Sequence, residues 1–180
     1  MNKLSERYYG NVSNGTVCED ILVRKSVHQD MPKILNLLNK TVQFSDEERQ
    51  CALELFNIYL TQGEKGGYDF LTAETNEKVF IGYICFGRIP LTDACYDIYW
   101  IVVEPEFQNK GSGSRLVESA EAQLRNEGAR KIFIETSGLP RYASAQNFYR
   151  KQGFELLASV NDFYRVGDSK LLFVKDLARS

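Results

Sequence analysis

The most informative stretch of the sequence is residues 100–116, which read Trp100-Ile101-Val102-Val103-Glu104-Pro105-Glu106-Phe107-Gln108-Asn109-Lys110-Gly111-Ser112-Gly113-Ser114-Arg115-Leu116. An apolar strand ends at Pro105, a polar loop with two glycines follows, and an amphipathic helix begins at once. This order directs successive backbone N–H groups and a helix N-terminus at one point, which is typical of a phosphate site. Gly111 and Gly113 have no Cβ, so the backbone there could turn sharply and approach an anion closely. A glycine-rich connection without any ligand is the alternative that this stretch leaves open.

The two common nucleotide motifs do not fit the stretch. A P-loop needs Lys followed by Ser or Thr after its last glycine, whereas Gly113 is followed by Ser114. A dinucleotide fingerprint could open at Gly111, and Glu135 lies about where its ribose-binding acid belongs. However, Leu116 occupies the third glycine position, and an antiparallel pattern precedes the motif.

On the N-terminal side of this stretch, the pattern predicts a strand over 21–24, two helices and then three strands. We expect the first helix to be capped by Asp30 and the second by Ser45, which forms a capping box with Glu48. The second helix should end near Gly63, and strands over 68–73, 79–86 and 96–103 are separated by polar turns, as in a meander. The residues expected to face inward from the two helices are Ile34, Leu35, Leu37, Leu38, Ala52, Leu55, Phe56, Tyr59 and Leu60.

On the C-terminal side, strands and helices alternate. A helix over 113–127 has Leu116, Val117, Ala120 and Leu124 on one face, and Gly128 ends it. We then expect a strand over 131–136, a helix over 143–152 closed by Gly153, and strands over 154–160 and 170–175. The whole pattern is that of an α/β (α+β) domain with a mixed sheet. We assign residues 1–19 to an N-terminal extension and residues 20–180 to a single domain.

Composition and charge exclude several classes of protein. Hydrophobic residues make up 43% and charged residues 26%, which excludes disordered and fibrous chains. The net charge of −2 gives no basic excess, so we expect no nucleic-acid partner. The longest apolar run, residues 79–86, is too short to span a bilayer, and residues 1–10 lack the apolar core of a signal peptide. We therefore expect a cytoplasmic protein without a membrane partner.

Cysteine and histidine usage excludes the usual metal and redox sites. The single histidine, His28, rules out a multi-histidine zinc site, and no C-x-x-C pair is present. We therefore expect no metal cofactor. The cysteines are best interpreted as small hydrophobic residues, and they are Cys18, Cys51, Cys85 and Cys95.

The motif Gln108-x-x-Gly111-x-Gly113, which follows a strand ending in Val-x-Pro, resembles the acetyl-CoA signature of the GNAT superfamily of N-acetyltransferases. The C-terminal half is also similar to the family pattern A-x-x-F-Y-x-x-x-G-F, here from Ala145 to Phe154. The resemblance extends over the chain from Ile21 onward. It implies a mostly antiparallel sheet of about six to seven strands flanked by about four helices. Many members have asparagine where this chain has Tyr142.

The family resemblance implies direct transfer of an acetyl group from acetyl-CoA to a primary amine, without a covalent intermediate. Pantetheine would pair with the strand edge like an added strand, and the pyrophosphate would lie on the N–H groups of the loop. A backbone N–H near Val103 would hold the oxyanion. The residues that the resemblance places against the cofactor are Ile101, Val102, Val103, Gln108, Asn109, Lys110, Gly111, Ser112, Gly113, Ser114 and Tyr149.

The amine must lose a proton, because a lysine-like amine has a pKa of about 10.4. Glu135, at the end of a predicted strand, is the first candidate base, and a solvated strand-end charge is its alternative. Asp97 or a chain of waters could serve instead. Tyr149 is the candidate acid for the departing thiolate by resemblance, and core packing is its alternative.

The sequence does not name the acceptor amine. A small metabolite or amino-acid-like acceptor is our first hypothesis, and a protein N-terminus or lysine is the second. A non-catalytic CoA-binding module is a third. The oligomeric state is open as well, with a homodimer as the commonest form for oligomers in general. By resemblance, Asn161 to Tyr164 would form the far wall of the acceptor site.

Overall fold

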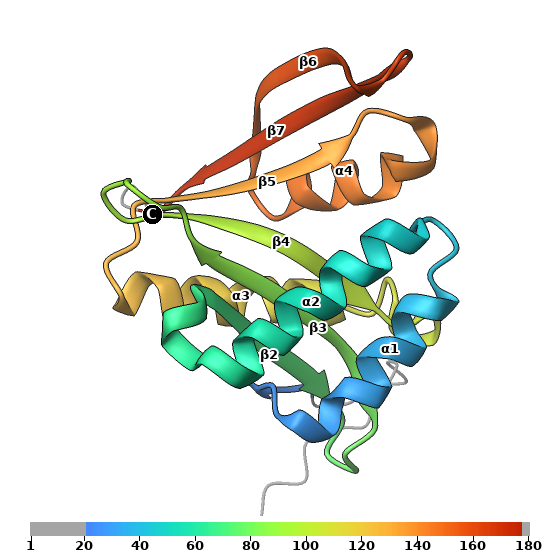
Figure 1. Cartoon of the computed structure of the whole chain (residues 1–180), viewed down its shortest axis with the longest axis vertical. Coiled ribbons are helices and arrows are strands. Elements are labelled where there is room, and N and C mark those ends of the chain that lie inside the picture. The colour runs from blue at the N-terminus through green and yellow to red at the C-terminus, as the bar shows by residue number, and fades with distance from the viewer. Residues whose placement is uncertain (1–20, 178–180) are drawn as a thin grey trace, which may run out of the picture.

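A single sheet of seven strands runs through residues 21–177, the part of the chain that the computed structural model describes (Figure 1). Its strand order is β1-β2-β3-β4-β5-β7-β6, and every neighbouring pair is antiparallel except β4 and β5. The mostly antiparallel sheet expected from the resemblance is confirmed. The N-terminal extension expected over residues 1–19 lies outside the described residues. The strands are β1 (Leu22–Lys25), β2 (Tyr68–Glu74), β3 (Phe80–Arg88), β4 (Cys95–Val103), β5 (Lys131–Ser137), β6 (Glu155–Arg165) and β7 (Asp168–Asp176).

Two pairs of helices cover the two faces of the sheet. In Figure 1, α1 and α2 lie in front of β2 to β4, whereas α3 and α4 lie behind the sheet. The expected number of about four helices is confirmed for residues 21–177, and single 3-10 turns connect several elements. The α-helices are α1 (Met31–Lys40), α2 (Asp46–Gln62), α3 (Ser112–Asn126) and α4 (Ala143–Lys151).

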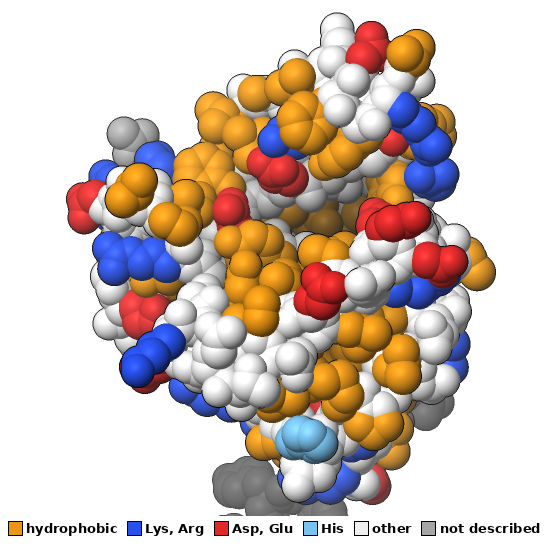
Figure 2. All heavy atoms as spheres, in the orientation of Figure 1, with side chains coloured by type: hydrophobic (Ala, Val, Ile, Leu, Met, Phe, Trp, Pro, Cys, Tyr) orange, Lys and Arg blue, Asp and Glu red, His pale blue; other side chains and the backbone are white. Residues whose placement is uncertain are grey.

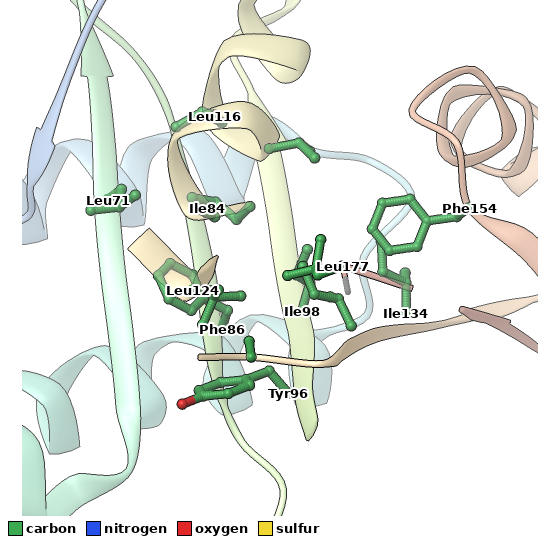
Figure 3. Packing of buried hydrophobic residues seen from close by; sticks show 14 of the residues in the cluster. Leu71, Ile84, Phe86, Tyr96, Ile98, Leu116, Leu124, Ile134, Phe154 and Leu177 are labelled. Carbon is green, nitrogen blue, oxygen red and sulfur yellow. The ribbon is translucent and has the colours of Figure 1, made fainter. Parts of the chain in front are cut away.

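Two apolar cores hold these layers together. Figure 3 shows part of the first core, in which residues of α3 and of β3, β4 and β5 meet Phe154 and Leu177. Leu116, Val117, Ala120 and Leu124 are buried in it, as predicted. The second core lies between α1, α2 and the opposite face. Its buried residues are Ile34, Leu37, Leu38, Ala52, Phe56, Phe70, Tyr83, Cys85 and Val102.

The N-terminal helices follow their sequence signals in part. Asp30 stands immediately before α1, but its side chain makes no capping hydrogen bond, because the carboxylate accepts from the Val27 N–H and pairs with Arg24. The capping box of α2 is present: Ser45 Oγ accepts from the Glu48 N–H, and Glu48 Oε2 accepts from the Ser45 N–H at 2.7 Å. Leu35, predicted to face inward, is 41% exposed. Helix geometry places it about 100° around from Ile34, outside the stripe that Ile34 shares with Leu38. In α2, the predicted Leu55, Tyr59 and Leu60 pack against the core but are only partly buried.

A bulge in β4 changes the register and the twist of the strands in the middle of the sheet. Cys85 pairs with Trp100 and Phe86 pairs with Ile98, so Tyr99 has no partner on β3. A bulge of this kind bends its strand and increases the local twist. The parallel pairing of β4 with β5 ends at the same place, at Ile98 and Ile134, and the two strands separate beyond it (Figure 1).

The last two strands form a hairpin that is longer than predicted. We expected a strand over 154–160, but β6 continues to Arg165. The register jumps from Val160 opposite Lys170 to Arg165 opposite Asp168, so the residues between bulge outward. Asp162 adopts a left-handed φ of 53° there, and its Oδ1 accepts from the Gly167 N–H at 2.7 Å. The segment from Asn161 to Tyr164 is therefore an irregular part of β6.

Among residues 21–177, no helix has both the length and the apolar composition needed to cross a membrane.

The contrast between two leucines of α1 gives a test of the second core. Leu37→Ala should lower the free energy of unfolding by about 2–5 kcal/mol, because Leu37 is 1% exposed and its loss leaves a cavity. Leu35→Ala, the matched control in the same helix, should cost less than about 1 kcal/mol. Urea unfolding of both variants measures the difference. Equal losses would contradict the assigned orientation of α1.

Candidate active site

A cleft of about 670 Å³ opens where β4 leaves β5. The exposed edge of β4, the turn before α3 and one face of α4 form its walls. Eight of the residues predicted to contact a cofactor line it, whereas Val102 turns its side chain into the second core. Lys110 and Ser112 belong to the same turn but do not line the cleft. The lining residues are Ile101, Val103, Gln108, Asn109, Gly111, Gly113, Ser114, Ser144, Ala145, Asn147, Phe148, Tyr149, Lys151 and Gln152.

The turn before α3 is built to expose backbone N–H groups. Asn109 and Gly111 have left-handed φ values of 58° and 87°, so the chain reverses tightly before α3 begins at Ser112. Ser112 Oγ donates to the Phe107 carbonyl at 2.9 Å and fixes the turn. The first N–H groups of a helix have no partner within the helix, and its dipole adds partial positive charge there. The turn can therefore hold an anion.

The Gln108 side chain connects this turn to the end of β4. Its Nε2 donates to the Val103 carbonyl at 3.0 Å. The sequence motif indicated only that the backbone of Gln108 contributes to an anion site. The structure adds a side-chain contact that fixes the position of the strand end relative to the turn.

Gly113 allows α3 and α4 to approach closely. A Cβ on Gly113 would lie 3.1 Å from the ring of Phe148. Close packing of the two helices thus favours glycine at position 113, whereas Gly111 is favoured by its positive φ. The two cations next to the turn point elsewhere: the Lys110 ammonium lies 5.6 Å from the Phe107 ring centroid, and Arg115 pairs with Glu118 at 3.2 Å.

Tyr149 lines the cleft from α4, where its ring packs 5.7 Å from Phe173 and 5.9 Å from Phe148. Burial raises the pKa of its hydroxyl to about 12, so Tyr149 is protonated at neutral pH. The ring of Tyr149 thus belongs to the packing of α4, and the residue also borders the cleft. Sequence analysis missed most of the α4 lining, although its spacing at Ser144, Phe148 and Lys151 marks one helical face.

Three charged groups lie on the opposite face of the sheet, across β4, β5 and β7. Asp97 is opposite Phe133, Glu135 is opposite Leu172, and Lys170 is opposite Ser137. Since directly paired residues share a face, the side chains of Asp97, Glu135 and Lys170 project to the same side. In Figure 2 the surface is hollowed between the β6–β7 hairpin and the α1–α2 pair, with acidic side chains near its edge.

The two carboxyl groups in this hollow differ in their environments. Burial and the negative charge of Glu135 together raise the pKa of Asp97 to about 6, against the opposing positive charge of Lys170. Glu135 is 47% exposed and accepts a charge-assisted hydrogen bond from Lys170 Nζ at 2.8 Å. Glu135, the first candidate base, is thus neutralised by a partner that the sequence did not reveal. Asp97 is the carboxyl whose pKa lies near the physiological range.

Aromatic side chains surround these charges. The Lys170 ammonium lies 4.2 Å from the ring centroid of Phe163, which contacts Tyr164 edge-on. The negative charge of Glu135 raises the pKa of Tyr164, after burial, so this part of β6 faces the charges. Tyr142 donates through its hydroxyl to the Gln43 carbonyl at 3.2 Å and joins α4 to the α1–α2 loop.

Known proteins provide an independent comparison. The Acetyltransferase (GNAT) family model matches residues 31–154. A putative acetyltransferase of the GNAT family from Desulfovibrio desulfuricans is 35% identical, with a TM-score of 0.83, over 87% of this chain and 99% of its own. No curated protein sequence matches the chain.

Two more distant structures share the fold. A spermidine/spermine N-acetyltransferase from Vibrio cholerae is 16% identical, with a TM-score of 0.68, over 90% of this chain and 95% of its own. An aminoglycoside 6′-N-acetyltransferase complexed with coenzyme A is 14% identical, with a TM-score of 0.68, over 87% of this chain and 97% of its own. Together with the strand separation and the glycine turn before α3, the family match and the 35% identical relative lead to one conclusion: the chain belongs to the GNAT family of acetyltransferases.

Proposed function

We propose that the protein transfers an acetyl group from acetyl-CoA directly to the primary amine of a small acceptor in the cytoplasm. The observation that supports this is the meeting of two sites at one break in the sheet. The cofactor cleft lies on the β4 edge beyond Ile98, and the half-buried carboxyl of Asp97 lies just before it on the same strand.

Acetyl-CoA fits the cleft by its chemistry. The pyrophosphate would accept from the backbone N–H groups between Gln108 and Ser114 at the start of α3. Pantetheine carries two amide groups, which can pair with the free edge of β4 from Ile101 to Val103 as a further strand would. The coenzyme A complex of the aminoglycoside acetyltransferase, a protein of the same fold, supports this choice.

Asp97 is our choice for the base. An alkylammonium with a pKa of about 10.4 must lose a proton before its nitrogen can attack. The Asp97 carboxylate, with a pKa of about 6, is ionised at neutral pH and can accept that proton directly or through water. The new C–N bond then forms as the C–S bond breaks, and the oxyanion is held by a backbone N–H near Val103.

Tyr149 acts at the departing sulfur. Its pKa of about 12 is far above the value of about 8.5 for a thiol, so full proton transfer to a free thiolate is unfavourable. The hydroxyl therefore works by donating a hydrogen bond to the sulfur as negative charge develops on it. The thiolate then takes its final proton from solvent or from the proton that the amine has released.

The cofactor is tested by thermal unfolding with acetyl-CoA. At one hundred times Kd, the ligand should stabilise the wild type by about 2.7 kcal/mol, whereas Gly113→Asp should abolish the shift. The new carboxylate would repel the pyrophosphate and meet the ring of Phe148. Ala122→Asp, an exposed position on the same helix, is the matched control and should keep the shift. Absence of any shift in the wild type would refute the proposal.

Asp97→Asn should change activity and stability in opposite directions. The kcat/KM should fall by about 10²–10⁴-fold and lose its acid limb near pH 6. The folded pKa of about 6 lies above the usual aspartate value of 3.8, so the contribution of Asp97 to stability is fully present below pH 4 and is lost as the pH rises through 6. The variant lacks this decline, and its melting temperature should exceed that of the wild type at pH 7.5 but match it near pH 4.

Glu135→Gln is the comparison variant for Asp97→Asn. Removing the Glu135 charge should move the acid limb of the rate profile to lower pH, because that charge raises the pKa of Asp97. The limb itself should persist. An unchanged pH profile in Asp97→Asn, with the limb lost in Glu135→Gln, would assign the base to Glu135 instead.

Tyr149→Phe should lower kcat by about a hundredfold with little change in acetyl-CoA affinity, because the hydrogen bond to the sulfur strengthens mainly in the transition state. The ring keeps its packing against Phe148 and Phe173, so the melting temperature should stay close to that of the wild type. Single-turnover rates with chemistry limiting provide the measurement. Equal rates in variant and wild type would leave Tyr149 with a packing role only.

A further inference from the structure

We propose that Lys170 is a specificity-determining residue, which binds a carboxylate that the acceptor carries next to its reactive amine. This inference rests on the proposed function and names the class of acceptor as an amino acid. The geometry points to it through the arrangement of Asp97, Glu135 and Lys170 on one face of the sheet.

The charges of the hollow favour a zwitterion over a second cation. Glu135 and Lys170 compensate each other at 2.8 Å, which leaves the carboxylate of Asp97 as the partner for one ammonium group. An acceptor with a second ammonium would meet the Lys170 charge at a place where Glu135 is already paired with that lysine. An ammonium has three donors, and the pairing with Glu135 at Oε1 occupies one of them.

The spacing of the two charges suits a short amino acid. Strands lie about 4.8 Å apart and rise about 3.3 Å per residue, which places the Cα atoms of Asp97 and Glu135 about 8 Å apart. The Lys170 Nζ is held at the Glu135 carboxylate, and its positive charge acts on the Asp97 carboxyl, so the two groups lie close enough to contact the two ends of one short acceptor.

Lys170 is held rigidly enough to discriminate between acceptors. Its side chain is 19% exposed and is fixed between the Glu135 carboxylate and the face of Phe163, 4.2 Å away. Aromatic rings near it, Phe163 and Tyr164, offer apolar contacts to the acceptor's side chain. A surface lysine without these contacts would be free to rotate away from an incoming cation.

The experiment compares each acceptor with a partner that lacks the carboxylate. Thiol release from acetyl-CoA is measured with leucine, tyrosine and lysine, with the matching 3-methylbutylamine, tyramine and 1,5-diaminopentane, and with the methyl esters. The esters keep the neighbouring carbonyl but lose the negative charge. For the preferred amino acid, wild-type kcat/KM should exceed that of its decarboxylated and esterified partners by at least tenfold.

Two substitutions then test whether Lys170 binds the acceptor's carboxylate or only neutralises Glu135. In Lys170→Met, the ratio of kcat/KM for the amino acid to that for its decarboxylated partner should fall to about 1, mainly through a higher KM for the amino acid. Lys170→Arg keeps the charge and should keep the preference. A further peptide acceptor with a free N-terminus, which lacks the neighbouring carboxylate, should be a poor substrate for the wild type.

The outcomes distinguish this inference from the proposed function. Equal or better turnover of amines, diamines or peptides by the wild type overturns the role of Lys170 but leaves acetyl transfer intact. If Lys170→Met keeps the preference for amino acids over their decarboxylated partners, the role of Lys170 is likewise overturned and acetyl transfer is left intact. Binding of acetyl-CoA without thiol release for any amino acid also overturns the inference, and absence of acetyl-CoA binding overturns the proposed function as well.

Discussion

The short parallel pairing between β4 and β5 is the constraint on which the site depends. The two strands pair over only four residues each, from Cys95 opposite Lys131 to Ile98 opposite Ile134. Beyond Ile98, β4 keeps its antiparallel partner β3 but loses β5, so its backbone groups on that edge need another partner. A ligand with amide groups can meet this need. The break in the sheet is thus also the reason for the cleft.

The bulge at Tyr99 determines which side chains face each side of this break. Before it, Tyr96 and Ile98 pack in the first core; after it, Ile101 and Val103 do so, which reverses the alternation along β4. Asp97 therefore faces the α1–α2 side, while the cleft between α3 and α4 opens behind. An acceptor and a cofactor can approach the same strand from opposite faces without blocking each other.

Much of the fold could be predicted because its signals are local. Capping residues, glycines with positive φ and helical spacing identified the helices, and alternating strands with polar turns identified the meander. Leu35 was assigned wrongly because an extra leucine beside a helical stripe looks like part of it. The strand predicted over 154–160 was too short, because the continuation of β6 depends on its ladder partner β7 and not on its own sequence pattern.

The site could be predicted only where a local sequence motif determines the backbone geometry. Gly111 and Gly113 indicate the tight turn before α3 directly, whereas the Glu135–Lys170 pair joins residues far apart in the chain. The burial that raises the pKa of Asp97 depends on the same tertiary arrangement. A half-buried carboxylate lowers the stability of the fold above its pKa, and a neighbouring cation limits that loss. Lys170 supplies this cation and also neutralises Glu135. One lysine therefore affects both the net charge of the hollow and the free energy needed to keep Asp97 ionised in the folded protein.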